Sequence, residues 1–197
     1  MKTRSTQFTG SIVGKLTKLS FLAAILGLIP QIGMSQNLVT DDTVEWFTLG
    51  GDYAHTRYTP ADEITADNFD ELEVAWEWDG SSFNGYSGRS TPTYVDGKLF
   101  TVSGPRRNVV AIDPKTGETL WAYRLPNTRR WEYSMRASYG KGITYSRIDG
   151  KGVVYISTPG FFLVALDAET GSPLEGFGGQ VPVEGFPETG VVDMLAD

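Results

Sequence analysis

Apolar and polar residues alternate in short runs through the second half of the chain, and this pattern predicts β-strands. Residues 93–102 (TYVDGKLFTV) form two such runs around Asp96-Gly97, which is the strongest short signal for a hairpin. Further apolar runs of strand length are bounded by turn residues. They cover residues 108–112, 119–123, 142–145, 152–157 and 162–165. The chain from residue 90 onward is therefore predicted to be all-β.

A nine-residue phrase occurs twice, as VVAIDPKTG at 109–117 and as LVALDAETG at 163–171. Five positions are identical, and the two copies are 54 residues apart. In each copy an Asp can accept hydrogen bonds from the backbone N–H groups just ahead of it, and a Gly supplies the positive φ that closes a turn. The phrase therefore predicts a tight connection between two strands, made once in each of two structural repeats.

Each repeat holds about 50 residues and four strands, a length that is typical of propeller blades. A single blade cannot bury both of its faces, so blades pack side by side in a ring of four to eight. Residues 73–197 hold two repeats and the start of a third, and are expected to be the first blades of a propeller in a longer protein. The alternative is a small two-blade domain, whose open edges would favour aggregation.

The residues before the blades, 36–72, are expected to form a lead-in. Residues 46–60 are rich in Gly, Tyr and Thr and predict an extended loop. Thr65 is predicted to cap a short helix from Ala66 to about Leu72, because a Thr side chain can accept from the first free N–H groups of a helix. The apolar alternation of Glu73–Trp78 predicts a strand.

Residues 1–35 have the features of a cleaved secretory signal peptide. Four basic residues and no acidic one lie in the first 18 positions, and the apolar run at 19–29 is too short to span a bilayer. Gly33 and Ser35 suit cleavage before Gln36. The protein is therefore expected in the periplasm or outside the cell, and the alternative is an uncleaved anchor.

Charge and composition exclude several classes of function. Without those four basic residues, 13 basic residues face 24 acidic ones, a net charge of about −11, so no nucleic-acid partner is expected. The sequence contains no cysteine, which excludes disulfides, thiolate metal sites and CxxCH haem attachment in this chain. It also lacks the GxGxxG, Walker, HExxH and nucleophile-elbow motifs.

The pattern Ala111-x-Asp113-x-x-Thr116-Gly117-x-x-x-Trp121 resembles the tryptophan-docking motif of the pyrroloquinoline quinone (PQQ) dehydrogenases, a family of eight-bladed β-propellers. The second copy keeps the Ala, Asp, Thr and Gly but has Glu175 in place of the Trp. Residues 50–60 and 64–76 resemble the family's N-terminal lead-in, and residues 90–97 resemble its first inner strand. The resemblance implies that Trp121 packs between neighbouring blades.

The same resemblance implies three cofactor-binding residues. Lys141, in the segment Lys-Gly-Ile-Thr-Tyr, occupies the place of a family Arg that contacts the quinone. Thr158 occupies the place of a hydroxyl group that contacts a PQQ carboxylate, and Arg89 stands where many members have Glu. PQQ is a flat quinone with three carboxylates, so cationic and hydroxyl donors suit its edge.

The resemblance therefore implies a PQQ-dependent dehydrogenase that oxidises an alcohol or an aldose sugar and passes electrons through PQQ to a respiratory acceptor such as a cytochrome c or a quinone. In the family, Ca²⁺ polarises the quinone and an Asp is the general base. That Asp and most calcium ligands are expected beyond Asp197, so no catalytic or metal-binding residue is predicted in this chain. The alternative is a non-enzymatic propeller that acts as a scaffold or binding module. It is favoured by Arg89 and by the lack of the vicinal cysteine pair that the alcohol-oxidising branch has near Met135.

The other charged residues are predicted to be structural or exposed. His55, the only histidine, lies in a polar loop, where a structural or solvent role is favoured over catalysis. The acidic residues between 62 and 73 are expected to form a solvated face rather than a metal site. The pairs Arg106-Arg107 and Arg129-Arg130 are expected to be exposed loop charges.

Overall fold

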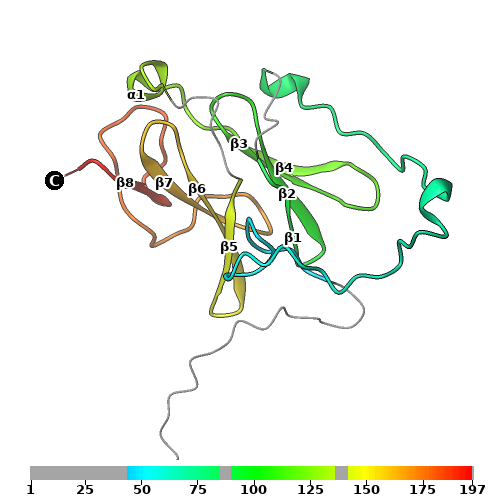
Figure 1. The fold of residues 1–197 in the computed structure, drawn as a ribbon. Coiled ribbons are helices and arrows are strands. Elements are labelled where there is room, and N and C mark those ends of the chain that lie inside the picture. The colour runs from blue at the N-terminus through cyan, green and yellow to red at the C-terminus, as the bar shows by residue number, and fades with distance from the viewer. Residues whose placement is uncertain (1–43, 85–89, 136–141, 197) are drawn as a thin grey trace, which may run out of the picture. The chain divides into compact units, whose positions relative to one another are not determined.

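The structure is a computed structural model that describes residues 44–84, 90–135 and 142–196. The chain divides into two units, residues 1–36 and 37–197, and every described residue belongs to the second unit. These residues form two four-stranded antiparallel sheets with very little helix (Figure 1), which confirms the predicted all-β class. Within the described ranges, no helix is long and apolar enough to cross a bilayer.

The first sheet contains the strands β1 to β4 in sequence order, so each strand is hydrogen-bonded to the next one along the chain. Asp96 and Gly97, with φ of 48° and 69°, make the predicted hairpin between β1 and β2. All five residues of β3 are buried, because this strand lies inside the sheet with both faces covered. The strands are β1 Thr93–Val95, β2 Lys98–Ser103, β3 Asn108–Ile112 and β4 Thr119–Tyr123.

The second sheet repeats this order with the strands β5 to β8. Its first three strands agree with the predicted ones, although β5 begins at Thr144 rather than at Gly142. The fourth strand, which the sequence pattern did not locate, follows a long loop at 173–190 that contains Glu175. The strands are β5 Thr144–Ile148, β6 Lys151–Ser157, β7 Phe162–Asp167 and β8 Val191–Asp193.

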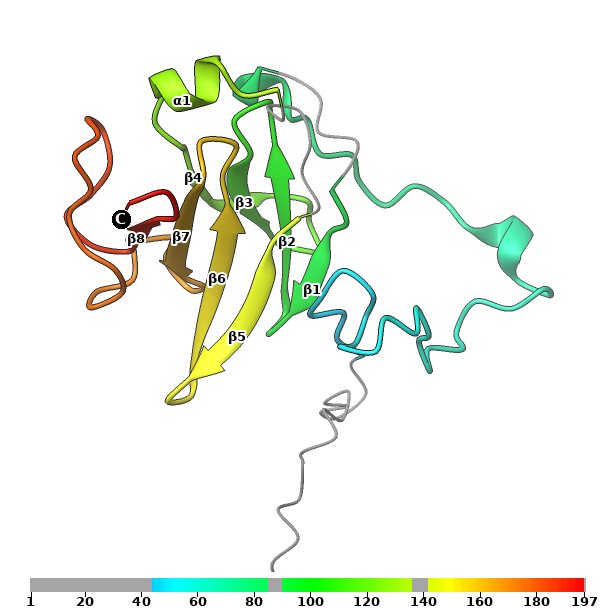
Figure 2. The ribbon, with the colours of Figure 1, turned by 60° about the vertical axis from the view of Figure 1, so that its left-hand side comes forward.

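The two sheets pack face to face over a shared apolar core (Figure 2). Phe100 and Val102 of β2 contribute to this core from the first sheet, and Val164 and Leu166 of β7 contribute from the second. All four side chains are at most 2% exposed. Because the fold has no disulfide, burial of this apolar surface is the main favourable contribution to its stability.

The repeated phrase forms the predicted turns. The Asp113 carboxylate accepts from the N–H groups of Lys115 and Thr116 at 2.7 and 3.3 Å, and Asp167 binds the equivalent groups in the second copy. Gly117 and Gly171 close the two turns with φ of 76° and 71°. The turn that was inferred from Asp and Gly spacing is therefore confirmed in both copies.

Each of these turns holds a tryptophan from earlier in the chain. Trp76 Nε1 donates to Pro114 O at 2.9 Å, and Trp121 Nε1 donates to Ala168 O at 3.1 Å. The indole rings lie directly over the closing glycines, so that a Cβ added to Gly117 would be 2.7 Å from the Trp76 ring. The predicted packing role of Trp121 is confirmed, and Trp76 has the same role, which the sequence pattern did not reveal.

One prediction for the lead-in is confirmed in part and one is wrong. The predicted helix at 66–72 is present only as a turn at 66–68 followed by a 3-10 helix, Phe69–Glu71, and the Asn68 side chain accepts from Thr65 N at 2.7 Å at the start of this turn. The predicted strand at 73–78 does not form. This segment binds the first sheet through its indole rings, and Trp78 Nε1 donates to Thr119 Oγ1 at 2.9 Å.

The two other helices are short. A 3-10 helix, Ser81–Phe83, follows the lead-in, and α1, Arg129–Glu132, lies between β4 and β5. The side chain of Thr128 caps α1 by accepting from Trp131 N at 3.1 Å. Both helices lie in connections, so neither adds a layer to the two sheets.

Candidate functional site

Thr158, the one predicted cofactor residue that the structure describes, lies at one end of the sheets, which we call the entry end. It is defined by Thr91, Gly142 and Thr158, at the points where β1 and β5 begin and where β6 ends. β1 and β5 are the first strands of their sheets and contact each other. The entry end therefore brings together the starts of the two neighbouring first strands.

Thr91 and Gly142 make a close contact at the entry end. Gly142 has φ of 109°, and a Cβ at this position would lie 2.7 Å from the carbonyl oxygen of Thr91. Only glycine permits this approach without strain. The two cations predicted to bind PQQ, Arg89 and Lys141, lie outside the described residues, but each is next to this contact in sequence, separated from it by at most Ser90.

Thr158 has a structural contact that the sequence did not predict. The residue is 7% exposed, and its Oγ1 accepts from Phe162 N at 3.0 Å, which closes the turn between β6 and β7. A hydroxyl that accepts one hydrogen bond can still donate another. In the part of the chain that the structure describes, no hydrogen bond joins Thr158 to Thr91 or Gly142.

Two arginines predicted to be exposed loop charges have specific partners in the second sheet. Arg107 Nη1 donates to Ser157 O at 2.7 Å, and burial lowers the pKa of its guanidinium from the ordinary value. Arg130 forms a bidentate ion pair with Asp193, in which Nη1 and Nη2 donate to the two carboxylate oxygens at 2.6 and 2.9 Å. Asp193 raises the pKa of Arg130 through this hydrogen bond, so both partners remain charged. Arg107 is therefore less exposed than predicted, whereas Arg130 is exposed as predicted but lies in the short helix α1 and is ion-paired.

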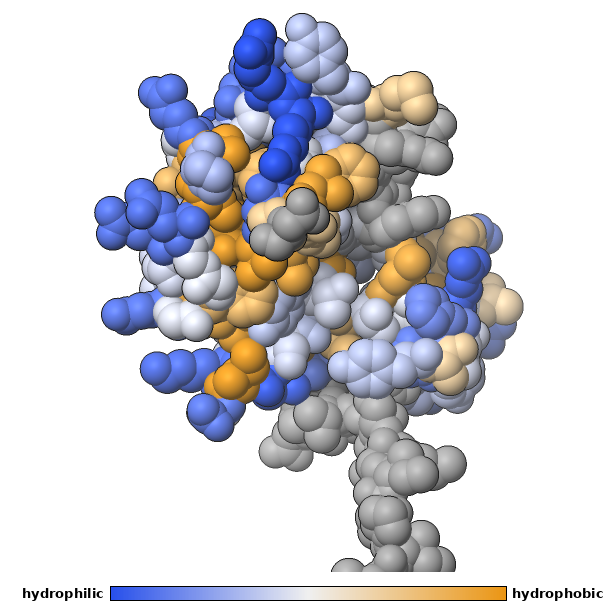
Figure 3. All heavy atoms as spheres, turned by 90° about the vertical axis from the view of Figure 1, so that its left-hand side faces the viewer, coloured by the Kyte–Doolittle hydropathy of each residue, from blue (hydrophilic) through white to orange (hydrophobic). Residues whose placement is uncertain are grey.

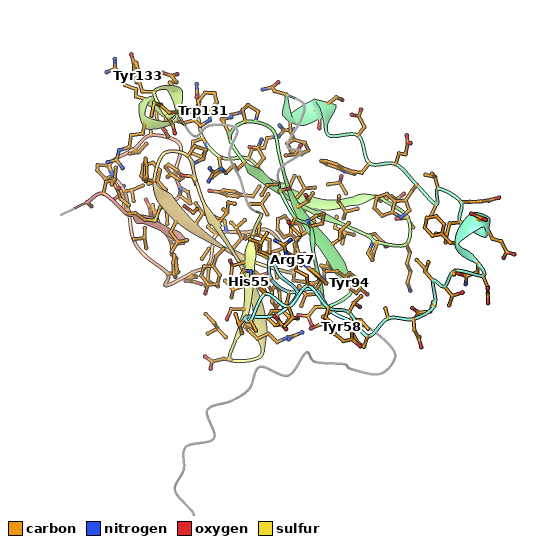
Figure 4. All side chains as sticks on the ribbon, viewed as in Figure 1. His55, Arg57, Tyr58, Tyr94, Trp131 and Tyr133 are labelled. Carbon is orange, nitrogen blue, oxygen red and sulfur yellow. The ribbon has the colours of Figure 1, made fainter. Side chains whose placement is uncertain are left out.

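The helix α1 lies across the entry end and contacts both sheets. Trp131 Nε1 donates to Pro105 O at 3.3 Å in the first sheet, and Arg130 reaches β8 in the second. Figure 4 shows Trp131 on this helix and Tyr133 directly after it, away from the His55 loop. Tyr133 is 80% exposed, so it is available to a ligand or to further protein.

The loop around His55 is structural. Asp52 accepts from the Thr56 backbone at 3.0 Å and from its hydroxyl at 2.7 Å, and these bonds lower the pKa of the Asp52 carboxyl. His55 and Arg57 both have φ of 55° and are exposed (Figure 4). Over residues 44–84, 90–135 and 142–196, no group of three or more His, Cys, Asp or Glu side chains could hold a metal ion.

Comparison with known proteins identifies relatives across most of the chain. Residues 46–194 match the family described as PQQ, "Glucose/ethanol/alcohol dehydrogenase, beta-propeller domain". The chain is 34% identical over 152 residues to the quinohemoprotein alcohol dehydrogenase of Comamonas testosteroni, a match that covers 74% of the chain and 20% of that protein.

Two further relatives show the same partial coverage. The chain is 37% identical over 128 residues to the 1-butanol dehydrogenase (cytochrome c) of Thauera butanivorans, covering 64% of the chain and 18% of that protein. It is 30% identical over 168 residues to the glycerol dehydrogenase large subunit of Gluconobacter oxydans strain 621H, covering 78% of the chain and 22% of that protein. The chain thus spans about a fifth of the length of the curated relatives that it matches.

The fold itself has a solved counterpart. A europium-containing methanol dehydrogenase superposes with a TM-score of 0.53 at 24% identity, over 65% of this chain and 22% of that one. At this level of identity the likeness concerns the fold alone. With the two blade-like sheets, it confirms the predicted partial β-propeller.

Proposed function

The chain belongs to the family of PQQ-dependent dehydrogenase β-propellers, and on this premise we propose that it forms the first blades of a quinone-dependent alcohol dehydrogenase. The activity belongs to the whole protein, of which these blades would supply one part of the cofactor site. The observation that carries the proposal is the close contact of Thr91 with Gly142, next to two cationic residues in sequence.

The residues at the entry end fit the chemistry of PQQ. The cofactor has three carboxylates and two quinone oxygens, and these groups accept hydrogen bonds from charged donors. Gly142 lets the starts of the two first strands approach closely, and Arg89 and Lys141 precede these starts in the sequence. Together with the Thr158 hydroxyl, they form a donor set that suits an anionic, planar ligand.

We assign a role in binding to each of these groups. The Lys141 ammonium would donate to the quinone oxygens as a point charge, and the Arg89 guanidinium would pair with a carboxylate. Thr158 would donate its hydroxyl proton to a carboxylate while its oxygen keeps the bond from Phe162 N. When bound, PQQ would accept the two electrons that are removed from the substrate. We also propose that Ca²⁺ accompanies PQQ, with ligands mostly outside this chain.

An alcohol is the substrate class that we favour over an aldose sugar. The relatives quoted above are named for alcohol, 1-butanol and glycerol. The name of the Thauera relative also includes cytochrome c. We therefore propose that a cytochrome c, or a quinone, accepts the electrons from PQQ.

The residue Lys141 provides the direct test of this proposal. In the full-length protein, Lys141→Ala should weaken PQQ binding by about one to two decades, because a charge-assisted hydrogen bond contributes roughly 1.5–3 kcal/mol. Lys141→Arg should keep most of the binding. The measurement is a PQQ titration with Ca²⁺ present, followed by the quinone absorbance.

Lys115→Ala is the matched control, because Lys115 is an exposed lysine in the Asp113 turn and its side chain should not affect the titration. Equal binding by wild type and Lys141→Ala would show that the cofactor lies elsewhere. A wild-type protein that binds no PQQ would overturn the proposed dehydrogenase activity. The role of a scaffold or binding module would then remain as the function. Arg89 and the lack of cysteine in the chain are the features that favour this second function.

We further propose that residues 1–35 export the protein to the periplasm or beyond. A mature N-terminus at Gln36 is expected, because small residues occupy the positions before it. N-terminal sequencing of the protein from the periplasmic fraction measures this directly. A protein that keeps Met1 and sediments with the membrane would instead be anchored.

A further inference from the structure

The first strands of the two sheets have no backbone hydrogen bonds to each other. Among the described strands β1 pairs with β2 and β5 with β6, and no ladder joins β1 to β5, although these two strands lie in contact. Their spacing is therefore set by contacts other than a hydrogen-bonded ladder. At the entry end this spacing is the contact of Thr91 with Gly142.

At the opposite end, four charged or polar side chains join β1 and β5. Asp96, in the turn that ends β1, accepts hydrogen bonds from the Tyr145 hydroxyl and from the Arg147 guanidinium. The buried carboxylate of Glu45 accepts from Arg147 Nη2 and from the backbone N of Asp96, both at 3.0 Å. We call these four residues the hairpin-end clamp, since they lie where β1 and β5 turn back.

The lead-in takes part in this connection. Trp46, next to Glu45, forms an isolated β-bridge with Tyr94 of β1, with N–O distances of 2.7 and 2.9 Å. Figure 1 shows the lead-in in cyan beside the far ends of β1 and β5. The clamp therefore fixes three segments that are far apart in sequence, with Glu45 and Arg147 separated by 102 residues.

Asp96 and Tyr145 have shifted pKa values that favour the hydrogen bond between them. Burial raises the pKa of the Asp96 carboxyl, but the hydrogen bonds from Arg147 and Tyr145 outweigh burial and keep that pKa below 3.8. Burial and the Asp96 carboxylate raise the pKa of the Tyr145 phenol above its usual value. The phenol therefore stays protonated and donates to Asp96 at neutral pH.

The clamp and the entry end lie on the same two strands. From Gly142 to Arg147 the chain is extended over five residues, about 16 Å. The Tyr145 ring lies between the two ends and contacts the Phe100 ring of the first sheet, with centroids 6.1 Å apart. A change in the spacing of β1 and β5 at one end is therefore carried by stiff strands and a close-packed core to the other.

We propose that Arg147 is a positioning residue, which through Asp96 and Glu45 holds β1 and β5 at the spacing that cofactor binding at the entry end requires. This inference rests on the proposed function. Arg147 would not touch the cofactor; it would act through the strand that begins after Gly142.

The test is a PQQ titration of the full-length protein with Ca²⁺ present, together with the Tm of the apo protein. Arg147→Met is expected to raise the Kd for PQQ about tenfold, because misplaced binding groups lose much of their contribution. Arg147→Lys should restore the Kd to within about twofold. Tyr145→Phe keeps the ring and removes only the bond to Asp96, and should raise the Kd about threefold. If Arg147→Met does not fold, the Kd of Tyr145→Phe tests the proposal instead.

Lys98→Met is the matched control. Lys98 also joins the two sheets at this end, through Glu169 at 2.6 Å, but it connects β2 to the turn after β7 rather than β1 to β5. It should leave the Kd unchanged. Wild-type affinity in Arg147→Met, or an equal loss in Lys98→Met, would show that Arg147 is structural only. A wild type that binds no PQQ would instead overturn the proposed function, and the inference with it.

Discussion

At the scale of single residues, the two turns require glycine at positions 117 and 171 because an indole ring packs against each of them. Gly171 has φ of 71°, and a Cβ there would lie 2.5 Å from the Trp121 ring. Two separate costs would follow from any larger residue: the strain of a positive φ and the displacement of the indole. At Gly176 only the strain would apply, since this residue has φ of 77° but no heavy atom lies within 4 Å of an added Cβ.

Gly171→Ala should therefore destabilise the protein more than Gly176→Ala does. The strain alone is about 1 kcal/mol and applies to both variants. Displacement of Trp121 should add about 1–3 kcal/mol at Gly171 only. Urea unfolding of both variants, followed by tryptophan fluorescence, measures the difference. Equal losses would mean that the indole moves aside without cost.

The structural role of Thr158 could not be predicted from its position in the family motif. Its position in the motif predicted contact with a cofactor carboxylate, and nothing in the sequence indicated that the same oxygen closes the β6–β7 turn. Thr158→Val would therefore change the fold and the proposed site together. Lys141 is the cleaner probe of cofactor binding for this reason.

At the scale of elements, the sequence predicted strands whose turn chemistry is local. The Asp96-Gly97 hairpin and the two Asp-x-x-Thr-Gly turns form as expected, because a few neighbouring residues determine each turn. The segment 73–78 has a strand pattern but forms no ladder, since its alternating apolar residues include two indoles that bind the first sheet. The strand β8 is three residues long and too short to give a periodic signal.

The candidate site was predicted only in part for a related reason. Motif position predicted three binding residues near strand ends, and the structure adds the contact of Thr91 with Gly142, which joins the starts of β1 and β5. The hairpin-end clamp of Glu45, Asp96, Tyr145 and Arg147 could not be predicted, because its members are separated by up to 102 residues and no pattern joins them. Long-range ion pairs depend on the packing of whole sheets rather than on local sequence.

At the scale of the whole molecule, one face of the second sheet carries exposed apolar residues. Figure 3 shows apolar side chains gathered on the side where β7 and β8 lie. Phe161, Val192, Met194 and Leu195 are between 36% and 56% exposed. In a β-propeller each sheet packs against another on both faces, so this face is expected to be covered in the complete protein.

Val192→Asp tests whether this face is covered. In the full-length protein the charge would be buried without a partner, and Tm should fall by roughly 2–6 °C. In the isolated 197-residue chain the side chain is at the surface, and the change should be close to zero. Thermal unfolding of both proteins, followed by circular dichroism, provides the comparison. A similar Tm change in both would show that the face stays exposed.

The docking of Trp76 and Trp121 also has a consequence for the order of assembly. Each indole is synthesised before the turn that receives it, by 38 residues for Trp76 and Pro114 and by 47 for Trp121 and Ala168. A growing chain can therefore add one blade at a time, because each new turn closes onto an indole that is already present. These two contacts form as soon as the next 38 or 47 residues have been made, which shortens the time for which an unpaired sheet edge is exposed.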